Sequence, residues 1–344
     1  MSTIAFPEKK TLPPLYPTIC GAIRNDGTLP RDFSLPRPAP EDAENKLRFA
    51  DGAFDGIALY HMQPDKRDIT SLTEIVGLLH AGSYEKADEC LGLFFSIDDY
   101  ISMLPLVEDL QKWIFAHREQ LDAGHIYEGA LYLLKNSAHI EAVKFALTCL
   151  ELLAAGGAND QRLRNLTRVM ALSDEFTLFS LFLMRQWPDS SEIIFDAARH
   201  VFGWGRIHAV SMLEPTTDEM RRWLLTDGWR NDIMPAYSAL LCVQKSGLSE
   251  KLADGSLSDA ELTAAGELLP HLLEDGPVAG IAALENADDF LNAYLSEAER
   301  RASCDSDFQA VEALLAYEQG RDIPKLDRIT RCRALLTKKK TETE

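Results

Sequence analysis

Residues 140–154 read IEAVKFALTCLELLA, and this stretch decides the fold class. Its apolar side chains fall into two stripes at helical spacing. The first stripe comprises Ile140, Val143, Leu147, Leu150 and Ala154, and the second comprises Phe145, Cys149 and Leu152. A helix with two apolar stripes needs neighbours on two sides, which stacked layers of helices provide. The stretch therefore predicts a helix that lies among other helices.

The same spacing recurs along the chain. One further example is formed by Ile233, Met234, Tyr237, Leu240 and Leu241. Glycines separate the successive patterns, as expected where a helix ends in a left-handed residue. Capping-box signals precede four of the patterns, at Ser71–Glu74, Thr216–Glu219, Ser258–Glu261 and Ser306–Gln309. We expect roughly a dozen or more helices of about 10–17 residues, joined by short loops, which is the spacing of α-solenoid repeats.

The predicted fold is therefore all-α, with an α-α superhelix of the HEAT or armadillo kind over residues 68–335. Exact self-similarity between the repeats is weak, so an irregular helical domain without a repeat is the alternative. Residues 336–344 carry Lys338-Lys339-Lys340 followed by alternating Thr and Glu, and they are expected to form a charged, frayed tail.

Residues 1–67 differ in composition from the rest of the chain. Half of the 16 prolines lie before residue 41, which predicts extended, turn-rich backbone. Asn25-Asp26-Gly27 lies between two short apolar runs, 19–24 and 28–33, and resembles a hairpin turn; residues 56–60 could form another strand. We expect a Pro-rich, partly β segment that packs on the helical body. It would either cap the first helix pair or fill the groove of the array.

The charge balance excludes several partners. The net charge is −19, from 35 basic and 54 acidic side chains, which disfavours binding to nucleic acid and to anionic membranes.

No apolar run is long enough for a transmembrane helix, and residues 1–10 do not resemble a signal peptide, so a cytoplasmic location is expected. The six cysteines show no zinc-like spacing.

Residues 203–230 read GWGRIHAVSMLEPTTDEMRRWLLTDGWR and hold three of the five tryptophans and four arginines. Trp and Arg dominate binding hot spots. The predicted binding residues are therefore Trp204, Arg206, His208, Arg221, Arg222, Trp229 and Arg230, and Trp229-Arg230 after Gly228 is the pair most expected to be exposed. The plainer interpretation is that the tryptophans and His208 are core residues and that the arginines tie loops together.

The neighbouring stretch 248–300 carries twelve acidic residues against two basic ones. This acidic zone would prefer a protein or peptide partner with a basic segment. A solvated helix face without any partner is the alternative interpretation of the same charges.

Two resemblances add to this. Residues 206–225, with Asp218 and Arg221 after an acidic loop, resemble a HEAT unit, which implies a helical repeat fold. The pattern from the Pro-rich opening to Gly-Trp-Gly-Arg-Ile-His-Ala-Val at 203–210 resembles poorly characterised bacterial proteins, some labelled limonene hydroxylase. That label implies an oxidoreductase, and HEAT-like DNA-repair proteins imply a nucleic-acid-binding alternative.

The sequence shows no pattern for catalysis. It contains no GxGxxG, no GxSxG and no Walker loop. We therefore predict no cofactor and no metal, and the sequence identifies no catalytic residue. The leading hypothesis is an interaction or scaffold protein that binds a protein or peptide through the concave face of the array.

Overall fold

The computed structural model describes residues 12–37, 49–62, 68–96, 102–157, 159–274 and 276–343. Within these ranges the regular structure is helical and no β-strand is present, so the all-α prediction is confirmed. The chain divides into two compact units, Met1–Ser190 and Ser191–Glu344. In the described ranges, no helix is both long and apolar enough to cross a membrane.

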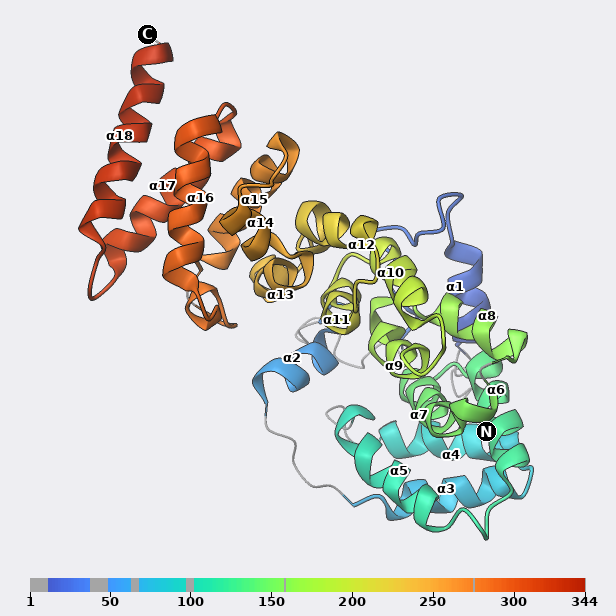
Figure 1. The fold of residues 1–344 in the computed structure, drawn as a ribbon. Coiled ribbons are helices and arrows are strands. Elements are labelled where there is room, and N and C mark those ends of the chain that lie inside the picture. The colour runs from blue at the N-terminus through green and yellow to red at the C-terminus, as the bar shows by residue number, and fades with distance from the viewer. Residues whose placement is uncertain are drawn as a thin grey trace, which may run out of the picture. The chain divides into compact units, whose positions relative to one another are not determined.

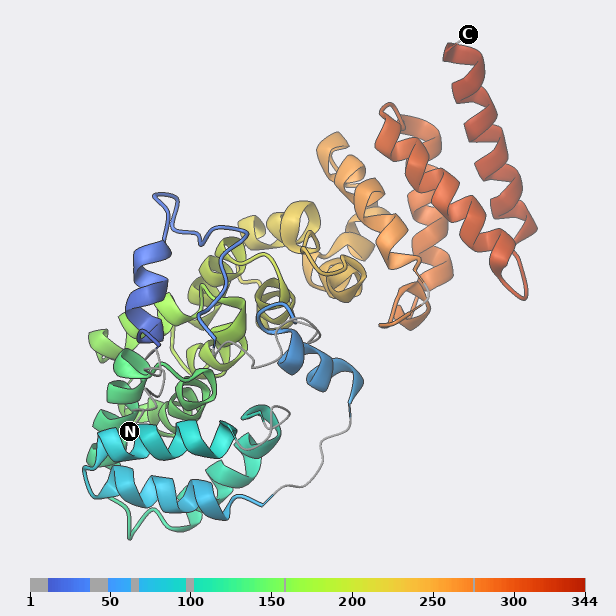
Figure 2. The ribbon, with the colours of Figure 1, turned by 180° about the vertical axis from the view of Figure 1, so that it is seen from behind.

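The first unit consists of nine described α-helices and one short 3-10 turn. They are α1 (Leu15–Ala22), α2 (Ala53–His61), α3 (Thr70–His80), α4 (Tyr84–Ser96), η1 (Leu104–Leu106), α5 (Val107–Ala116), α6 (Ala123–Asn136), α7 (Ile140–Gly157), α8 (Gln161–Met170) and α9 (Asp174–Met184). Consecutive helices pack as the pairs α3–α4, α6–α7 and α8–α9. Figures 1 and 2 show α3 and α4 side by side from opposite directions.

These pairs form two layers. Helices α3, α6 and α8 contact one another in succession, and so do α4, α7 and α9. Helix α1 packs on α6 and α8, in the first of these layers. Helix α7 is the 140–154 stretch, and it contacts α4, α5, α6 and α9. The neighbours that its two apolar stripes require are therefore present, with Val143, Phe145 and Cys149 all buried.

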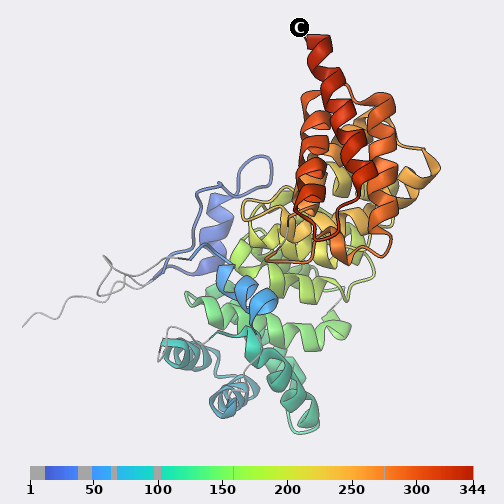
Figure 3. The same ribbon diagram turned by 90° about the vertical axis from the view of Figure 1, so that its left-hand side faces the viewer.

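The second unit has the same alternation in its C-terminal part. Its elements are α10 (Ser190–His200), α11 (Trp204–Met212), α12 (Asp218–Trp223), the π-helical turn η2 (Leu224–Gly228), α13 (Ala236–Ser246), α14 (Leu248–Asp254), α15 (Asp259–Leu272), η3 (Ile281–Ala283), α16 (Ala287–Arg301), α17 (Asp305–Gly320) and α18 (Leu326–Thr343). Helices α13, α15 and α17 contact in succession, as do α14, α16 and α18. Figure 3 shows α16, α17 and α18 running alongside one another.

The strands predicted in the N-terminal segment are wrong where the structure describes it. Residues 19–22 belong to α1, and residues 56–60 belong to α2. Prolines do not prevent α1, because Pro14 is the N-cap and Pro17 lies in the first turn, where backbone N–H groups have no helical acceptor. Residues 1–11, 38–48 and 63–67 of this segment lie outside the described residues.

Two local predictions at helix ends need correction. Of the four capping boxes, the one at Ser258–Glu261 is confirmed, with reciprocal bonds between the two residues. The other helices begin after Ile69, Thr217 and Cys304 instead. In addition, residues 336–343 of the expected charged tail belong to α18, which continues to Thr343.

Candidate functional site

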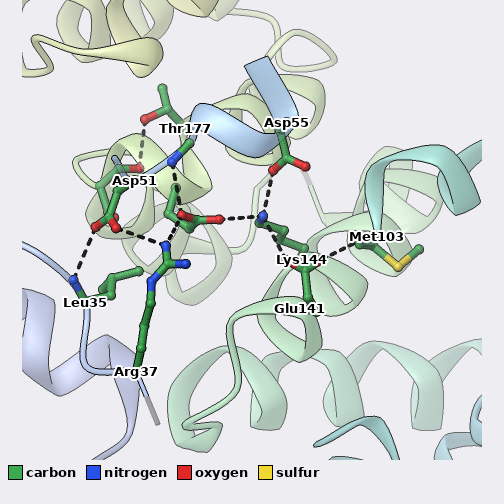
Figure 4. Close-up of polar contacts among 11 residues, drawn as sticks. Leu35, Arg37, Asp51, Asp55, Met103, Glu141, Lys144 and Thr177 are labelled. Carbon is green, nitrogen blue, oxygen red and sulfur yellow. Dashed lines mark hydrogen bonds and ion pairs between the residues drawn. The ribbon is translucent and has the colours of Figure 1, made fainter. Parts of the chain in front are cut away.

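A buried lysine on α7 is the centre of a cluster of charged side chains in the first unit. The side chain of Lys144 is 1% exposed. Its Nζ donates to Asp55 Oδ2 at 2.6 Å, to Glu175 Oε1 at 2.6 Å and to Glu141 Oε1 at 2.9 Å. Burying an ammonium without partners is costly, so three carboxylates around one cation are what its burial requires. Figure 4 shows Asp55 and Glu141 pointing at Lys144 from different helices.

A second cation extends this arrangement. Arg37 Nη2 lies 2.7 Å from Glu175 Oε2 and 3.0 Å from Asp51 Oδ1. The backbone N–H of Gly52 also donates to Glu175 Oε2, at 3.0 Å. Both oxygens of Glu175 are therefore engaged. We call the whole set the Lys144 cluster, and it consists of Arg37, Asp51, Asp55, Glu141, Lys144 and Glu175.

The helices place these groups by simple spacing. Glu141 and Lys144 are three residues apart on α7, so they share one face. Glu175 lies in the first turn of α9, and Asp55 lies in the first turn of α2, where carboxylates are favoured by the helix dipole. The N–H of Met103 donates to Glu141 Oε2 at 2.6 Å (Figure 4). The cluster therefore ties α2 and residue 37 to α7 and α9, in the layer opposite to the one that α1 covers.

Electrostatics fix the protonation of the centre. The surrounding carboxylates outweigh burial and raise the pKa of Lys144 well above its usual value. Burial raises the pKa of Asp55, and burial with the charges of Asp55 and Glu175 raises the pKa of Glu141 to about 7. For Glu175, Lys144 and Arg37 overcome burial and lower the pKa. An ammonium held in this way is no nucleophile, so the cluster acts as a charged lock between chain segments.

Glu141 gives the first unit a specific pH dependence. The folded protein holds this proton up to about pH 7, whereas the unfolded chain releases it near pH 4.5. The stability contributed by Glu141 is therefore full below pH 4.5 and falls as the pH rises through this window. Glu141→Gln lacks this pH dependence, so the difference in unfolding free energy between the variant and the wild type should shift in the variant's favour by up to about 3 kcal/mol as the pH rises from 5 to 8. Urea unfolding of both proteins at several pH values measures this gain.

The control for this prediction is Glu108→Gln. Glu108 lies exposed on α5 and pairs with Lys112. The difference in unfolding free energy between Glu108→Gln and the wild type should therefore stay constant over the same pH range. A constant difference for Glu141→Gln as well would show that Glu141 is ionised throughout.

The predicted exposure of Trp229 is wrong. Its side chain is 4% exposed, and its Nε1–H donates to the carbonyl of Leu225 at 3.0 Å. The π-helical turn η2 ends at Gly228 and directs the following ring inward, where it lies 5.2 Å from the ring of His271. A π-helical turn leaves no signal in the apolar spacing, which is why the sequence pattern misplaces this residue.

Arg206 is buried and binds backbone rather than facing a partner. Its Nε donates to Val201 O at 2.8 Å, and its Nη1 donates to Arg230 O at 3.0 Å and Asp227 O at 3.3 Å. Its Nη2 donates to Arg199 O at 3.4 Å. One guanidinium therefore fastens the end of α10 to the turn after η2. This agrees with the plainer interpretation, in which the arginine ties loops together.

Trp204 and His208 are core residues. The ring of Trp204 contacts Tyr237 edge-on at 5.1 Å and stacks against His208 at 6.2 Å. Burial lowers the pKa of His208 to about 3, so its imidazole is neutral at physiological pH. Neither ring is available to a partner in this structure.

The remaining predicted residues lie at the surface. Arg222 is exposed, and Arg221 is partly exposed beside Asp218 at 3.5 Å. Arg230 is exposed, with its guanidinium 4.5 Å above the Trp229 ring and paired with Glu267. The structure thus splits the seven predicted residues into a buried set of four and a surface set of three arginines.

Several acidic residues of the zone 248–300 pair with bases within the same unit. Lys251 pairs with Glu261 at 2.5 Å, and Arg331 pairs with Glu299 at 2.7 Å. Glu297 is bound by two arginines at the end of α16, and Asp288 is bound by three cations from the loop between α17 and α18 and the first turn of α18. Part of the negative charge of this zone is therefore neutralised by neighbouring bases, and other acidic residues, such as Glu250 and Glu285, are exposed.

The Lys144 cluster was missed by the sequence analysis. Its signal was Lys144 itself, a charged residue within the apolar stretch that defines α7. A lysine at that position must bury its charge, which predicts acidic partners on neighbouring helices. Nothing in the sequence identifies Asp55, 89 residues away, as one of them.

The Lys144 cluster does not line the cavity that the structure shows. A concavity of about 390 Å³ in the second unit is lined by the loop residues Glu274, Gly276, Val278, Ala279, Gly280, Ala282 and Ala283, and by no member of the cluster. Over the described ranges, no group of three or more His, Cys, Asp or Glu side chains is arranged to hold a metal ion.

No protein-family model matches the sequence, and neither a curated protein nor a solved structure is significantly similar to it.

Proposed function

We propose that this protein is a helical-repeat scaffold of the HEAT or armadillo kind, which binds a protein or peptide partner through the concave face of its helix stack. The observation that carries this proposal is the alternation of contacts within each unit. Helices that are not consecutive in the chain pack on one another in succession, in the order α3, α6, α8 and in the order α13, α15, α17. Stacked helix pairs with this alternation build the extended surfaces on which repeat proteins bind their partners.

The Lys144 cluster supports a scaffold. Its ammonium is already engaged by three carboxylates, and it joins segments separated by 89 and 31 residues. Such a lock holds residue 37 and residues 51–55 in one position on α7 and α9. A rigid stack loses less conformational entropy when a partner binds than a flexible chain does.

The partner we propose carries a basic segment. The net charge of −19 attracts cations over a range of about 8–10 Å at physiological salt. The same field slows the approach of nucleic acids and of anionic lipid surfaces.

Affinity capture at two salt concentrations tests the proposed function. The immobilised chain should retain a specific partner at low salt and release it as the salt concentration rises. An immobilised acidic protein of similar net charge serves as the control for non-specific retention. Equal retention on both matrices, or no retention on either, would refute the scaffold proposal.

A further inference from the structure

The loop between α17 and α18 displays two apolar side chains to solvent. Ile323 is 79% exposed and Leu326 is 72% exposed, the two largest fractions among the large apolar side chains that the structure describes. They are three residues apart, and Pro324 lies between them. Figure 1 shows this loop at the end of the α17–α18 hairpin. We call Asp322–Asp327 the apolar tip.

Buried charges hold the backbone of the apolar tip in place. Glu318, at the end of α17, is fully buried and accepts the N–H of Lys325 at 3.0 Å. Its other oxygen accepts from Arg321 at 3.2 Å and from Arg328, which is 2% exposed. Both ends of the loop are therefore fixed to a single buried carboxylate.

A second carboxylate reinforces the same loop from α16. Asp288 Oδ1 accepts from Arg321 at 3.3 Å and from Arg328 at 3.1 Å, and Asp288 Oδ2 lies 3.3 Å from Lys325 Nζ. The pair of Glu318 with Arg328 is buried and restricts the loop to one geometry, whereas the pairs of Asp288 with Arg321 and Lys325 are partly exposed and contribute less. In this geometry the side chains of Ile323 and Leu326 stay exposed to solvent and contact little of their own chain.

The charge around the tip selects its partner. Three cations lie in or next to the loop, and each is paired with Glu318 or Asp288. They are Arg321, Lys325 and Arg328. Within the tip, Asp322 and Asp327 are exposed, and the charge of Lys325 is paired with Asp288, so the rim of the tip is anionic. A fixed apolar tip with an anionic rim complements an apolar surface that is bordered by lysine or arginine.

We propose that the apolar tip is a docking site for a basic amphipathic helix of a partner protein, in which Ile323 and Leu326 insert between the apolar side chains of that helix. This inference goes beyond the proposed binding through the concave face, because it names a second contact surface at a hairpin tip and the chemistry of the partner there. A preordered loop is suited to this role because it loses little entropy on binding.

The test uses a helical peptide of leucine and lysine, its leucine–glutamate counterpart, and the full-length chain. The Leu/Lys peptide should bind the wild type, and binding should weaken as salt rises. The double variant Ile323→Ser/Leu326→Ser should lose at least about tenfold in affinity, since two apolar side chains no longer become buried. Fluorescence anisotropy of the labelled peptide measures both values.

Leu93→Ser is the matched control. Leu93 is 69% exposed on α4 in the first unit, and its loss should leave peptide affinity unchanged. All three replaced side chains are exposed, so the variants should match the wild type in circular dichroism and urea midpoint. Absence of peptide binding to the wild type, equal affinity in the double variant, or equal binding of the glutamate peptide would overturn the proposal.

Two other occupants are outcomes of the same test. Binding of the wild type to phosphatidylglycerol vesicles, lost in the double variant, would identify a membrane instead. A change in oligomeric state in the double variant would identify a second copy of the chain. Either result overturns the proposal. In the capture experiment, equal retention of a partner by wild type and double variant refutes the tip alone, whereas no retention by the wild type refutes the scaffold function.

Discussion

Replacing Lys144 with methionine is expected to destabilise the first unit by about 3–5 kcal/mol at neutral pH. Methionine has a similar length and fits the buried space, so the loss reflects charge rather than volume. Without the ammonium, the carboxylates of Asp55, Glu141 and Glu175 face one another in a buried site. Only Arg37 would remain to compensate them, and it contacts just one of the three.

The measurement is urea unfolding followed by hydrogen exchange, since exchange reports each unit separately. Peptides from α7 and α9 should exchange faster in Lys144→Met, and peptides from α15 and α17 should not. The loss should shrink at low pH, because protonated carboxylates no longer need a cation. Lys112→Met is the control, because Lys112 is exposed on α5 and its pair with Glu108 lies at the surface; we expect an effect of less than about 1 kcal/mol. A similarly small effect for Lys144→Met would mean that water reaches the cluster.

The fold could be predicted further than the site because the two depend on different signals. The stripes of α7 are a local, periodic pattern, and burial of Val143, Phe145 and Cys149 follows from it. Helix α1 was missed because prolines near Leu15 resembled an extended chain, although a helix tolerates proline at its start. Whether a proline is tolerated depends on its position within the helix, and the spacing of apolar residues does not reveal that position.

The site could not be predicted because its contacts are long-range. Tryptophan and arginine in residues 203–230 have the composition of a binding hot spot, yet composition does not reveal whether a side chain faces solvent. Four backbone carbonyls around Arg206 come together only when η2 turns the chain back, and no residue type signals a carbonyl. Likewise, Asp55 meets Lys144 only through the placement of α2.

Arg206 offers the sharpest separation of structural and binding roles in the second unit. Arg206→Lys keeps the positive charge but replaces a fork of donors by one ammonium, which cannot reach carbonyls on several sides. About two of its charged hydrogen bonds should be lost, and each contributes about 1.5–3 kcal/mol. We therefore expect a loss of about 3 kcal/mol in the stability of the second unit, measured by urea unfolding. Faster hydrogen exchange should be confined to the region from α10 to α13.

The matched control is Arg222→Lys, since Arg222 is exposed on α12 in the same segment. It should leave stability unchanged within about 0.5 kcal/mol. If Arg206→Lys were as stable as the wild type and only partner capture weakened, Arg206 would be a binding residue after all, and its four carbonyl bonds would be dispensable. If stability falls while capture by the folded fraction persists, residues 203–230 act by holding the backbone between α10 and α13. The surface arginines at 221, 222 and 230 would then be the part of this segment left to contact a partner.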